Sequence, residues 1–418
     1  MITDSYNYRR LPNGIRLIHR QKAGQIAHLA LMVNTGSRDE QAHEFGLAHL
    51  IEHMIFKGTK KRKAYHVLSR LENVGGELNA YTTKEETCIH ASFLNIYAER
   101  SMELLADIAF QASFPASELE KEKEVVLDEI NAYRDNPSEE IFDEFEDQLF
   151  DGHPIGHPIL GTEQAVKSFS RNALFRFVKR NYATDQMVLA LVGDIPFDKF
   201  WQIAEKYFGN TLAKGHAPKL DSVINPTIQH IQKEKNSYLS HCILGNKSYN
   251  RQHPNKHGMV LLNNILGGPG LNSRLNLNIR EKYGFAYNIE SHYTAYSDTG
   301  IFLVYLGIDP RSAEKAMQLV YKELYKLKNQ QLGSLQLHRA QQQLIGQLAI
   351  GFESGLSETL SIARSHLLFD NVDNMNQIIQ KILKTDASKL MEVAQEIFDF
   401  DNFNTLIYKG TQKDFASN

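Results

Sequence analysis

The chain has 418 residues, of which 42% are hydrophobic and 23% charged, and its formal net charge is −3. These values are typical of a soluble globular protein with two domains. They give no electrostatic reason to expect a nucleic acid or an anionic membrane as partner. The two cysteines, Cys88 and Cys242, lie far apart, which excludes a disulfide framework and a cysteine-rich zinc site.

The N-terminal segment lacks the apolar core of a secretory signal. No stretch of the chain approaches the ~20 apolar residues that are needed to cross a bilayer. We therefore expect a cytoplasmic protein without a transmembrane segment.

Apolar runs in the first half predict strands that alternate with helices. The Asn13-Gly14 pair predicts the turn of an N-terminal hairpin. Helices are expected at residues 45–56, 64–74, 96–111 and 117–134, and strands at 28–34, 77–81, 87–93 and 186–192.

The second half follows the same plan. Strands are expected at 238–244, 285–294, 300–306 and 404–408, and helices at 256–266, 312–329 and 335–352. Residues 213–226 contain two prolines and a glycine without apolar periodicity, which is typical of a linker. We therefore predict an α+β protein with two similar domains, 1–212 and 227–418, each an antiparallel sheet with helices on one face.

The helix expected at 45–56 carries the first candidate site. Its sequence FGLAHLIEHMIF is apolar or glycine except at His49, Glu52 and His53. At 100° per residue these three side chains share one face of a helix that is otherwise apolar and should be buried. A buried ionisable trio is costly unless it is paired or bound to a metal. The pattern H-x-x-E-H is that of the inverted zinc peptidases, with two imidazole ligands and a carboxylate beside the bound water.

A third ligand is expected from the helix at 117–134. Glu122 and Glu129 fall within its apolar stripe, two turns apart, and both need partners. Glu129 would bind the cation, and Glu122 would orient a ligating histidine. The alternative is that both carboxylates pair with lysine or arginine at the flank of the helix.

Several motifs together resemble the pitrilysin family, in particular its short chains that are similar to mitochondrial processing peptidase. The segments that carry this resemblance are HLIEHMIFKGT (49–59), GGELNAYTTKEET (75–87), EKEKEVVLDEI (120–130), HPIGHPILGT (153–162), MVLALVGDI (187–195) and LGGPGLNSRLNLNIREKYGFAY (266–287). The family places its third zinc ligand about 76 residues after the second histidine, and Glu129 lies 76 positions after His53.

The resemblance implies a fold and a set of roles. It implies two homologous domains per chain, and two chains or fused halves that close as a clamshell around a peptide. Each chain would hold one Zn²⁺ through His49, His53 and Glu129, with Glu52 as the general base. Arg280 and Tyr287 of a partner chain would stabilise the oxyanion. On the simpler interpretation, Arg280 is a solvated helix residue and Tyr287 is half-buried in a strand.

The function expected from these observations is zinc-dependent endopeptidase activity on peptides or unfolded segments within an enclosed chamber. The substrate would add as a strand to the sheet edge formed by Asn79, Ala80, Tyr81 and Thr82. Because the chain has both the metal motif and the Arg280/Tyr287 pair, a homodimer is expected. Two alternatives remain open: a catalytic subunit that needs a different partner chain, and a non-catalytic subunit that binds peptides or acts as a scaffold.

Overall fold

The computed structural model describes residues 6–213, 215 and 227–411, so the predicted linker at 213–226 lies almost wholly outside the described residues. The chain divides into two units. The first comprises the described residues within Met1–Asn131, His157–Lys219 and Ala349–Met375. The second comprises those within Ala132–Gly156, Leu220–Leu348 and Asn376–Asn418. Each unit therefore takes segments from both halves of the sequence.

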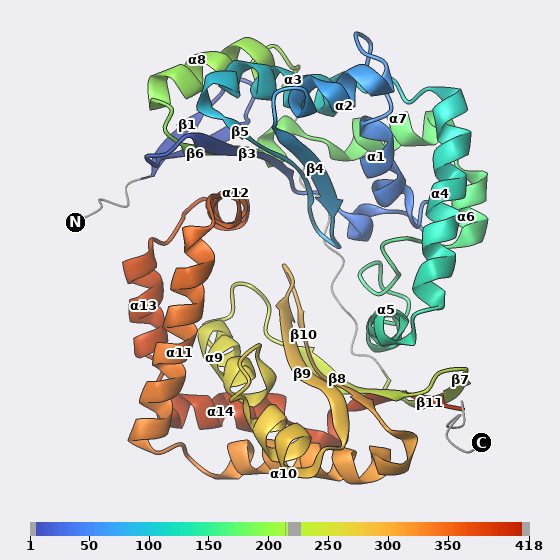
Figure 1. The fold of residues 1–418 in the computed structure, drawn as a ribbon, viewed down its shortest axis with the longest axis vertical. Helices are drawn as coiled ribbons and strands as arrows, with labels where there is room; N and C mark the ends of the chain where they lie inside the picture. Colours follow the sequence, from blue (N-terminus) through green and yellow to red (C-terminus); the bar gives the residue numbers. More distant parts are fainter. Residues whose placement is uncertain (1–5, 214, 216–226, 412–418) are drawn as a thin grey trace. The chain divides into compact units, whose positions relative to one another are not determined.

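A six-stranded sheet forms the centre of the first unit, with strand order β1-β2-β6-β3-β5-β4 (Figure 1). Its strands are β1 (Asn7–Arg10), β2 (Arg16–Gln21), β3 (Ile26–Val33), β4 (Glu77–Thr82), β5 (Thr87–Leu94) and β6 (Met187–Gly193). Neighbouring strands are antiparallel except β2 and β6, which are parallel. The strand β4 forms one edge, which matters for the site described below.

Helices cover both faces of this sheet. Those in or entering the first unit are α1 (Leu47–Ile55), α2 (Ala64–Glu72), α3 (Ala98–Phe110), α4 (Ala116–Arg134), α6 (Glu163–Ser168), α7 (Arg171–Asn181), α8 (Phe197–Phe208) and α12 (Gly355–Phe369). The main core joins one face of the sheet to residues of α1, α3 and α8. On the opposite face, Ile362, Ala363 and Leu367 of α12 pack against β3 and β6 (Figure 1). Because both of its faces are covered, β6 is buried at every position.

The second unit repeats this arrangement around a five-stranded sheet, ordered β7-β11-β8-β10-β9. Its strands are β7 (His230–Lys235), β8 (Ser240–Ser248), β9 (Ala286–Ala295), β10 (Gly300–Ile308) and β11 (Asn404–Gly410). Its helices are α5 (Pro137–Leu149), α9 (Lys256–Gly267), α10 (Ala313–Asn329), α11 (Ser334–Glu353), α13 (Met375–Leu383) and α14 (Ala387–Ile397). The end of α11 and the first residue of α13 belong to the first unit. One face packs on α9, α10 and α14, and the other packs on α5 through Ile141, Phe145 and Leu149.

The predicted fold class is confirmed: there are two α+β domains, each with a sheet covered by helices. Two details of the prediction are wrong. Each sheet includes one parallel pair, β2–β6 in the first and β7–β11 in the second. The helices also cover both faces, because each half of the sequence contributes one helix to the unit formed mainly by the other half: α5 to the second and α12 to the first. No helix within the described residues has the length and apolarity to cross a membrane.

Candidate metal centre

The helix α1 holds three ionisable side chains over a buried core. Its residues Leu47, Leu50, Ile51 and Met54 are buried, whereas His49, Glu52 and His53 are partly exposed. The ring centroids of His49 and His53 lie 4.6 Å apart. This spacing follows from their i, i+4 positions, which face the same side of a helix.

The helix α4 brings a carboxylate to these imidazoles. Glu129 Oε2 lies 3.8 Å from His49 Nε2 and 3.6 Å from His53 Nε2. One ligand atom from each of the three side chains lies within 4.8 Å of the other two. The structure therefore brings together the three side chains that the sequence nominated as ligands, from two helices that also lie side by side in Figure 1.

The chemistry of this trio fits a divalent cation. Among the described residues, Glu129 Oε2 and His49 Nδ1 are buried and have no hydrogen-bond partner. Burial, together with the neighbouring His53, lowers the pKa of His49 to about 4. His49 is thus neutral at pH 7, the form in which imidazole binds a metal. Two imidazoles and one carboxylate are also the protein ligands of several catalytic zinc sites, which leave a fourth position for water.

Glu122 lies behind His53, as expected for an orienting residue. Its Oε2 is 3.2 Å from His53 Nδ1, and its Oε1 is 2.7 Å from Lys57 Nζ. The carboxylate is 7% exposed, so both contacts matter for its solvation. Because the Glu122 carboxylate accepts a hydrogen bond from Nδ1–H, His53 Nε2 carries no proton and is an acceptor that faces Glu129. The alternative pairing with lysine is therefore also present, and Glu122 makes both contacts at once.

Glu52 is the third polar residue of α1. Burial raises its pKa, the negative charge of Glu129 acts in the same direction, and His53 opposes it. A raised pKa suits a general base, because its conjugate acid can later return the proton. Hydrogen bonds from Thr82 also lower the pKa of Glu52, which places this carboxylate near the end of the edge strand β4.

The predicted substrate segment forms this edge strand. Asn79, Ala80, Tyr81 and Thr82 belong to β4, which pairs with β5 alone among the described strands. The helix α1 packs against β4. An extended peptide added to this edge would run past the metal ligands, but binding of substrate here stays a prediction.

Arg280 and Tyr287 belong to the second unit. Arg280 lies in a π-helical turn (Asn276–Glu281), and its Nη1 donates a 3.4 Å hydrogen bond to Asn276 Oδ1. Tyr287 lies on β9 and is 80% exposed, which is more than the half-buried strand residue of the simpler interpretation. The catalytic role of the pair stays a prediction.

Sequence reasoning missed the residues that hold the start of α1. The Glu40 carboxylate accepts hydrogen bonds from the backbone N–H groups of Gly46 and Ala48, and contacts His157 Nε2 at 2.9 Å. The His157 ring stacks on Phe45 at 3.8 Å. Burial raises the pKa of Glu40 well above its usual range, while the two backbone N–H groups lower it. Glu40 thus satisfies two N–H groups that the first turn of a helix leaves unpaired.

The backbone around Gly46 packs closely against the backbone around Gly161, which holds the start of α1 in place. Gly46 has φ of 98°, and a Cβ there would lie 2.5 Å from the carbonyl oxygen of Leu160. Gly161 has φ of 73°, and a Cβ there would lie 2.1 Å from the carbonyl oxygen of Phe45. Only glycine fits both positions. Residues 157–161 therefore pack against the start of α1, which gives the second half of the HPIGHPILGT motif a structural role.

Comparison with known proteins identifies the family of the chain. Residues 16–163 match the family described as "Insulinase (Peptidase family M16)", and residues 168–344 match "Peptidase M16 inactive domain". A relative from Bacillus subtilis, "Uncharacterized zinc protease YmxG", is 31% identical over 94% of this chain and 96% of its own length. The chain belongs to peptidase family M16.

Further similar proteins carry the same kind of name. An "Uncharacterized zinc protease" from Mycobacterium leprae is 30% identical over 93% of this chain and 88% of its own. Two solved structures share the fold of this M16 chain. A protease from Helicobacter pylori has a TM-score of 0.89 at 21% identity, covering 97% of this chain and 99% of its own. A Pseudomonas fluorescens structure titled as a peptidase M16 inactive domain has a TM-score of 0.90 at 20% identity, covering 98% and 99%.

Proposed function

We propose that this M16 chain is a zinc-dependent endopeptidase that hydrolyses peptides or unfolded polypeptide segments. The observation that carries the proposal is the convergence of His49, His53 and Glu129, whose ligand atoms lie within 4.8 Å of one another. The names of the relatives support zinc and proteolysis as the chemistry. In this proposal each chain holds one Zn²⁺ through the Nε2 atoms of the two histidines and a carboxylate oxygen of Glu129.

The roles of the side chains follow from their positions. A zinc ion held by these residues would lower the pKa of a water molecule toward ~7 and would supply a positive charge for the scissile carbonyl. Glu52 accepts the proton of the attacking water and later donates it to the leaving amine. Glu122 holds His53 in the tautomer that presents Nε2. The edge of β4 binds the substrate main chain in extended form, which tolerates many sequences.

The proposal extends to a homodimer in which Arg280 and Tyr287 of a second copy donate hydrogen bonds to the developing oxyanion. The exposure of Tyr287, at 80%, supports its availability to a substrate or a second chain. Light scattering of the active protein tests this part. An active, monodisperse monomer would contradict it.

The decisive experiment replaces Glu52 by Gln. Because Glu52 is proposed as the base and not as a ligand, the variant should keep its zinc while hydrolysis of a quenched fluorescent peptide falls by about 10²–10⁴-fold. The matched variant His49→Ala should instead lose zinc, as measured by elemental analysis. Turnover retained by Glu52→Gln would refute the assigned base, and full zinc content in His49→Ala would refute that ligand.

Two alternatives are separated by the same assay. A catalytic subunit that needs a different partner chain would be inactive alone and active after mixing with that partner. A non-catalytic subunit that binds peptides would bind the probe and never cleave it, with or without a chelator. The ligand trio favours catalysis, because a scaffold has no need of three converging ligands and a carboxylate of raised pKa beside them.

A further inference from the structure

A basic pocket lies in the first unit, beside the turn that joins α1 to α2. It has a volume of about 500 Å³, within the usual range of ligand-binding cavities. None of the described residues that line it is acidic, and none is a metal ligand. Its cationic lining residues are Lys61, Arg62, Arg70 and Arg100. Such a lining suits a polar, negatively charged ligand instead of an apolar one.

Hydrogen bonds and ion pairs hold the turn that carries Lys61 and Arg62. Thr59 donates its backbone N–H to the Arg62 carbonyl at 2.8 Å, and its hydroxyl donates to Asp107 Oδ2 at 2.8 Å. The Arg62 guanidinium pairs with Glu103 at 2.7 Å and also with Asp107. These contacts anchor the turn to α3 and hold the Arg62 guanidinium in place before any ligand arrives.

The other two guanidinium groups are also positioned by the protein. Arg70 Nη2 lies 3.3 Å from Glu103 Oε2, while its buried Nε has no hydrogen-bond partner among the described residues. Arg100 Nη1 donates to the Arg70 carbonyl at 3.4 Å, and its guanidinium lies 5.3 Å from the centre of the Tyr97 ring. Because this Nε is buried and the side chain is 36% exposed, an anion in the pocket would contact Arg70 through its other guanidinium nitrogens.

The charges of the basic pocket are not balanced. Among the described residues, two carboxylates, those of Glu103 and Asp107, form ion pairs with its four cationic side chains. Arg62 pairs with both of them. Lys61 and Arg100 form no ion pair with any described residue. The exposed Lys60 and Lys63 flank Lys61 and Arg62 in sequence and add to the positive potential. This cavity therefore carries a local excess of positive charge in a chain of net charge −3.

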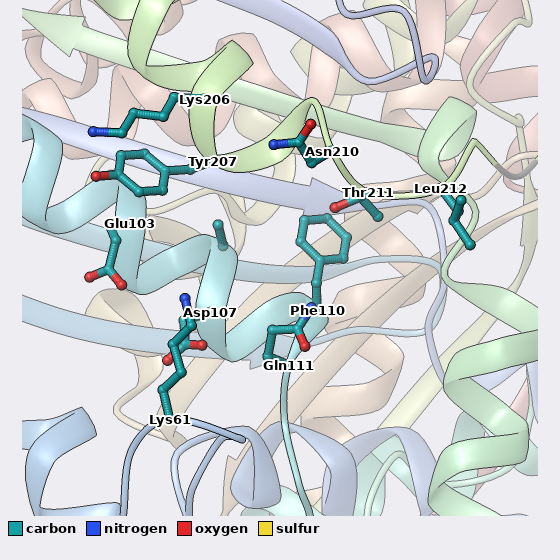
Figure 2. A pocket seen from close by; sticks show the side chains of 11 residues that line it. Lys61, Glu103, Asp107, Phe110, Gln111, Lys206, Tyr207, Asn210, Thr211 and Leu212 are labelled. Carbon is teal, nitrogen blue, oxygen red and sulfur yellow. The ribbon is translucent and has the colours of Figure 1, made fainter.

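A neighbouring cavity differs from the basic pocket in the charge of its lining. This second cavity, of about 630 Å³, also borders Lys61, but Glu103 and Asp107 line it together with Lys206 (Figure 2). Figure 2 shows both carboxylates on α3, across from Lys206 and Tyr207 of α8. An anion would meet these two carboxylates directly in the second cavity, whereas in the basic pocket it would meet only cations and neutral polar groups.

We propose that the basic pocket binds an oligophosphate anion. Arginine guanidinium groups in fixed positions make paired hydrogen bonds to phosphate oxygens, and Lys61 adds a point charge. The net positive charge and the volume suit an anion with two or more phosphate groups. Such an anion has two sources, a free di- or triphosphate and the headgroup of a phosphorylated lipid. This binding site is separate from the metal centre, so it stands or falls independently of peptidase activity.

The test uses the full-length protein and titrates inorganic tripolyphosphate by calorimetry at low and at physiological ionic strength. In parallel, vesicles of phosphatidylcholine with and without a bisphosphorylated phosphoinositide are sedimented with the protein. The double variant Lys61→Gln/Arg100→Gln should weaken binding by about 100-fold, since each change removes one charge-assisted hydrogen bond. It leaves Arg62 and its ion pairs in place, so the variant should fold. The matched control is Arg176→Gln/Lys179→Gln, which removes two exposed charges from α7.

Each outcome is informative. Tripolyphosphate binding that the double variant loses and the control keeps supports a free oligophosphate as the ligand. The same pattern with phosphoinositide vesicles alone supports a lipid headgroup. The proposal is overturned if neither probe binds, or if the control weakens binding as much as the double variant, which would indicate nonspecific attraction to the surface.

Discussion

The contact between Glu40 and His157 predicts that a residue far from the metal ligands in sequence controls metal binding. The change His157→Ala removes the 2.9 Å contact to Glu40 and the stacking of the ring on Phe45. Removing one partner of a buried hydrogen bond costs about 1–3 kcal/mol, and an aromatic pair contributes about 0.5–1.5 kcal/mol. Because both partners of the contact are almost fully buried, water cannot replace it. We expect the free energy of unfolding to fall by about 2–4 kcal/mol.

The functional consequence follows from the position of Glu40 at the start of α1. His49 is the third residue of this helix and directly follows Ala48. The backbone N–H of Ala48 donates a hydrogen bond to the Glu40 carboxylate. When Glu40 is no longer fixed, the first turn loosens and His49 leaves its place beside His53. Residues that orient metal ligands typically change metal affinity by 10–100-fold when mutated, and we expect about a tenfold rise in the Kd for zinc.

Two assays separate positioning from general stability. Urea denaturation measures the unfolding free energy, and competition with a chromogenic chelator measures the zinc Kd of the folded protein. His157→Gln keeps a side-chain donor and should recover part of the affinity. His43→Ala, an exposed histidine in the same loop region, should change neither quantity. A loss of stability without any change in the zinc Kd of the folded protein would refute the positioning role.

Further predictions concern the carboxylates around α1. Glu122→Gln should raise the zinc Kd by about 10–100-fold because it loses the charge that orients His53. Competition with a chelator measures this Kd, and Glu120→Gln, a change at an exposed position of the same helix, is the control. A Kd equal to that of the control would contradict the prediction. Burial raises the pKa of Asp39 from 3.8 to about 6. The folded protein therefore keeps this proton when the unfolded chain has lost it, so stability falls by up to about 3 kcal/mol as pH rises from about 4 to 6. Asp39→Asn should remove that part of the slope in urea titrations across this range, and an identical slope would show that another group causes it.

The elements that carry the metal site could be predicted from sequence because their periodicity is strong. The apolar residues of α1 leave one polar face, and the stripe of α4 includes two carboxylates that need partners. Convergence of the two helices could only be inferred, since 76 positions separate His53 from Glu129 and local pattern does not specify tertiary contacts. The ligand choice among the acids of α4 thus depended on the stripe and on the family resemblance.

Other features left no readable pattern. Glu40 and His157 lie in loops, where no periodicity marks a buried polar residue, and only the resemblance drew attention to residues 153–162. The amphipathic helices α5 and α12 signal an apolar face but not the sheet that receives it. Which unit each helix joins is decided by the tertiary fold, where Ile362 of α12 packs against the first sheet and Phe145 of α5 against the second.

The described residues of the second unit contain no counterpart of the ligand trio. Its helix α9 packs against β9 as α1 packs against β4. However, α9 contains no aspartate or glutamate, and its buried polar side chain in the middle of the apolar run is Asn264. An asparagine side chain has neither the negative charge nor the imidazole nitrogen that zinc sites use. Because α9 packs against its sheet without offering a set of zinc ligands, we expect elemental analysis of the purified protein to find one zinc per chain. A measured content of two per chain, with both lost on treatment with a chelator, would contradict this assignment.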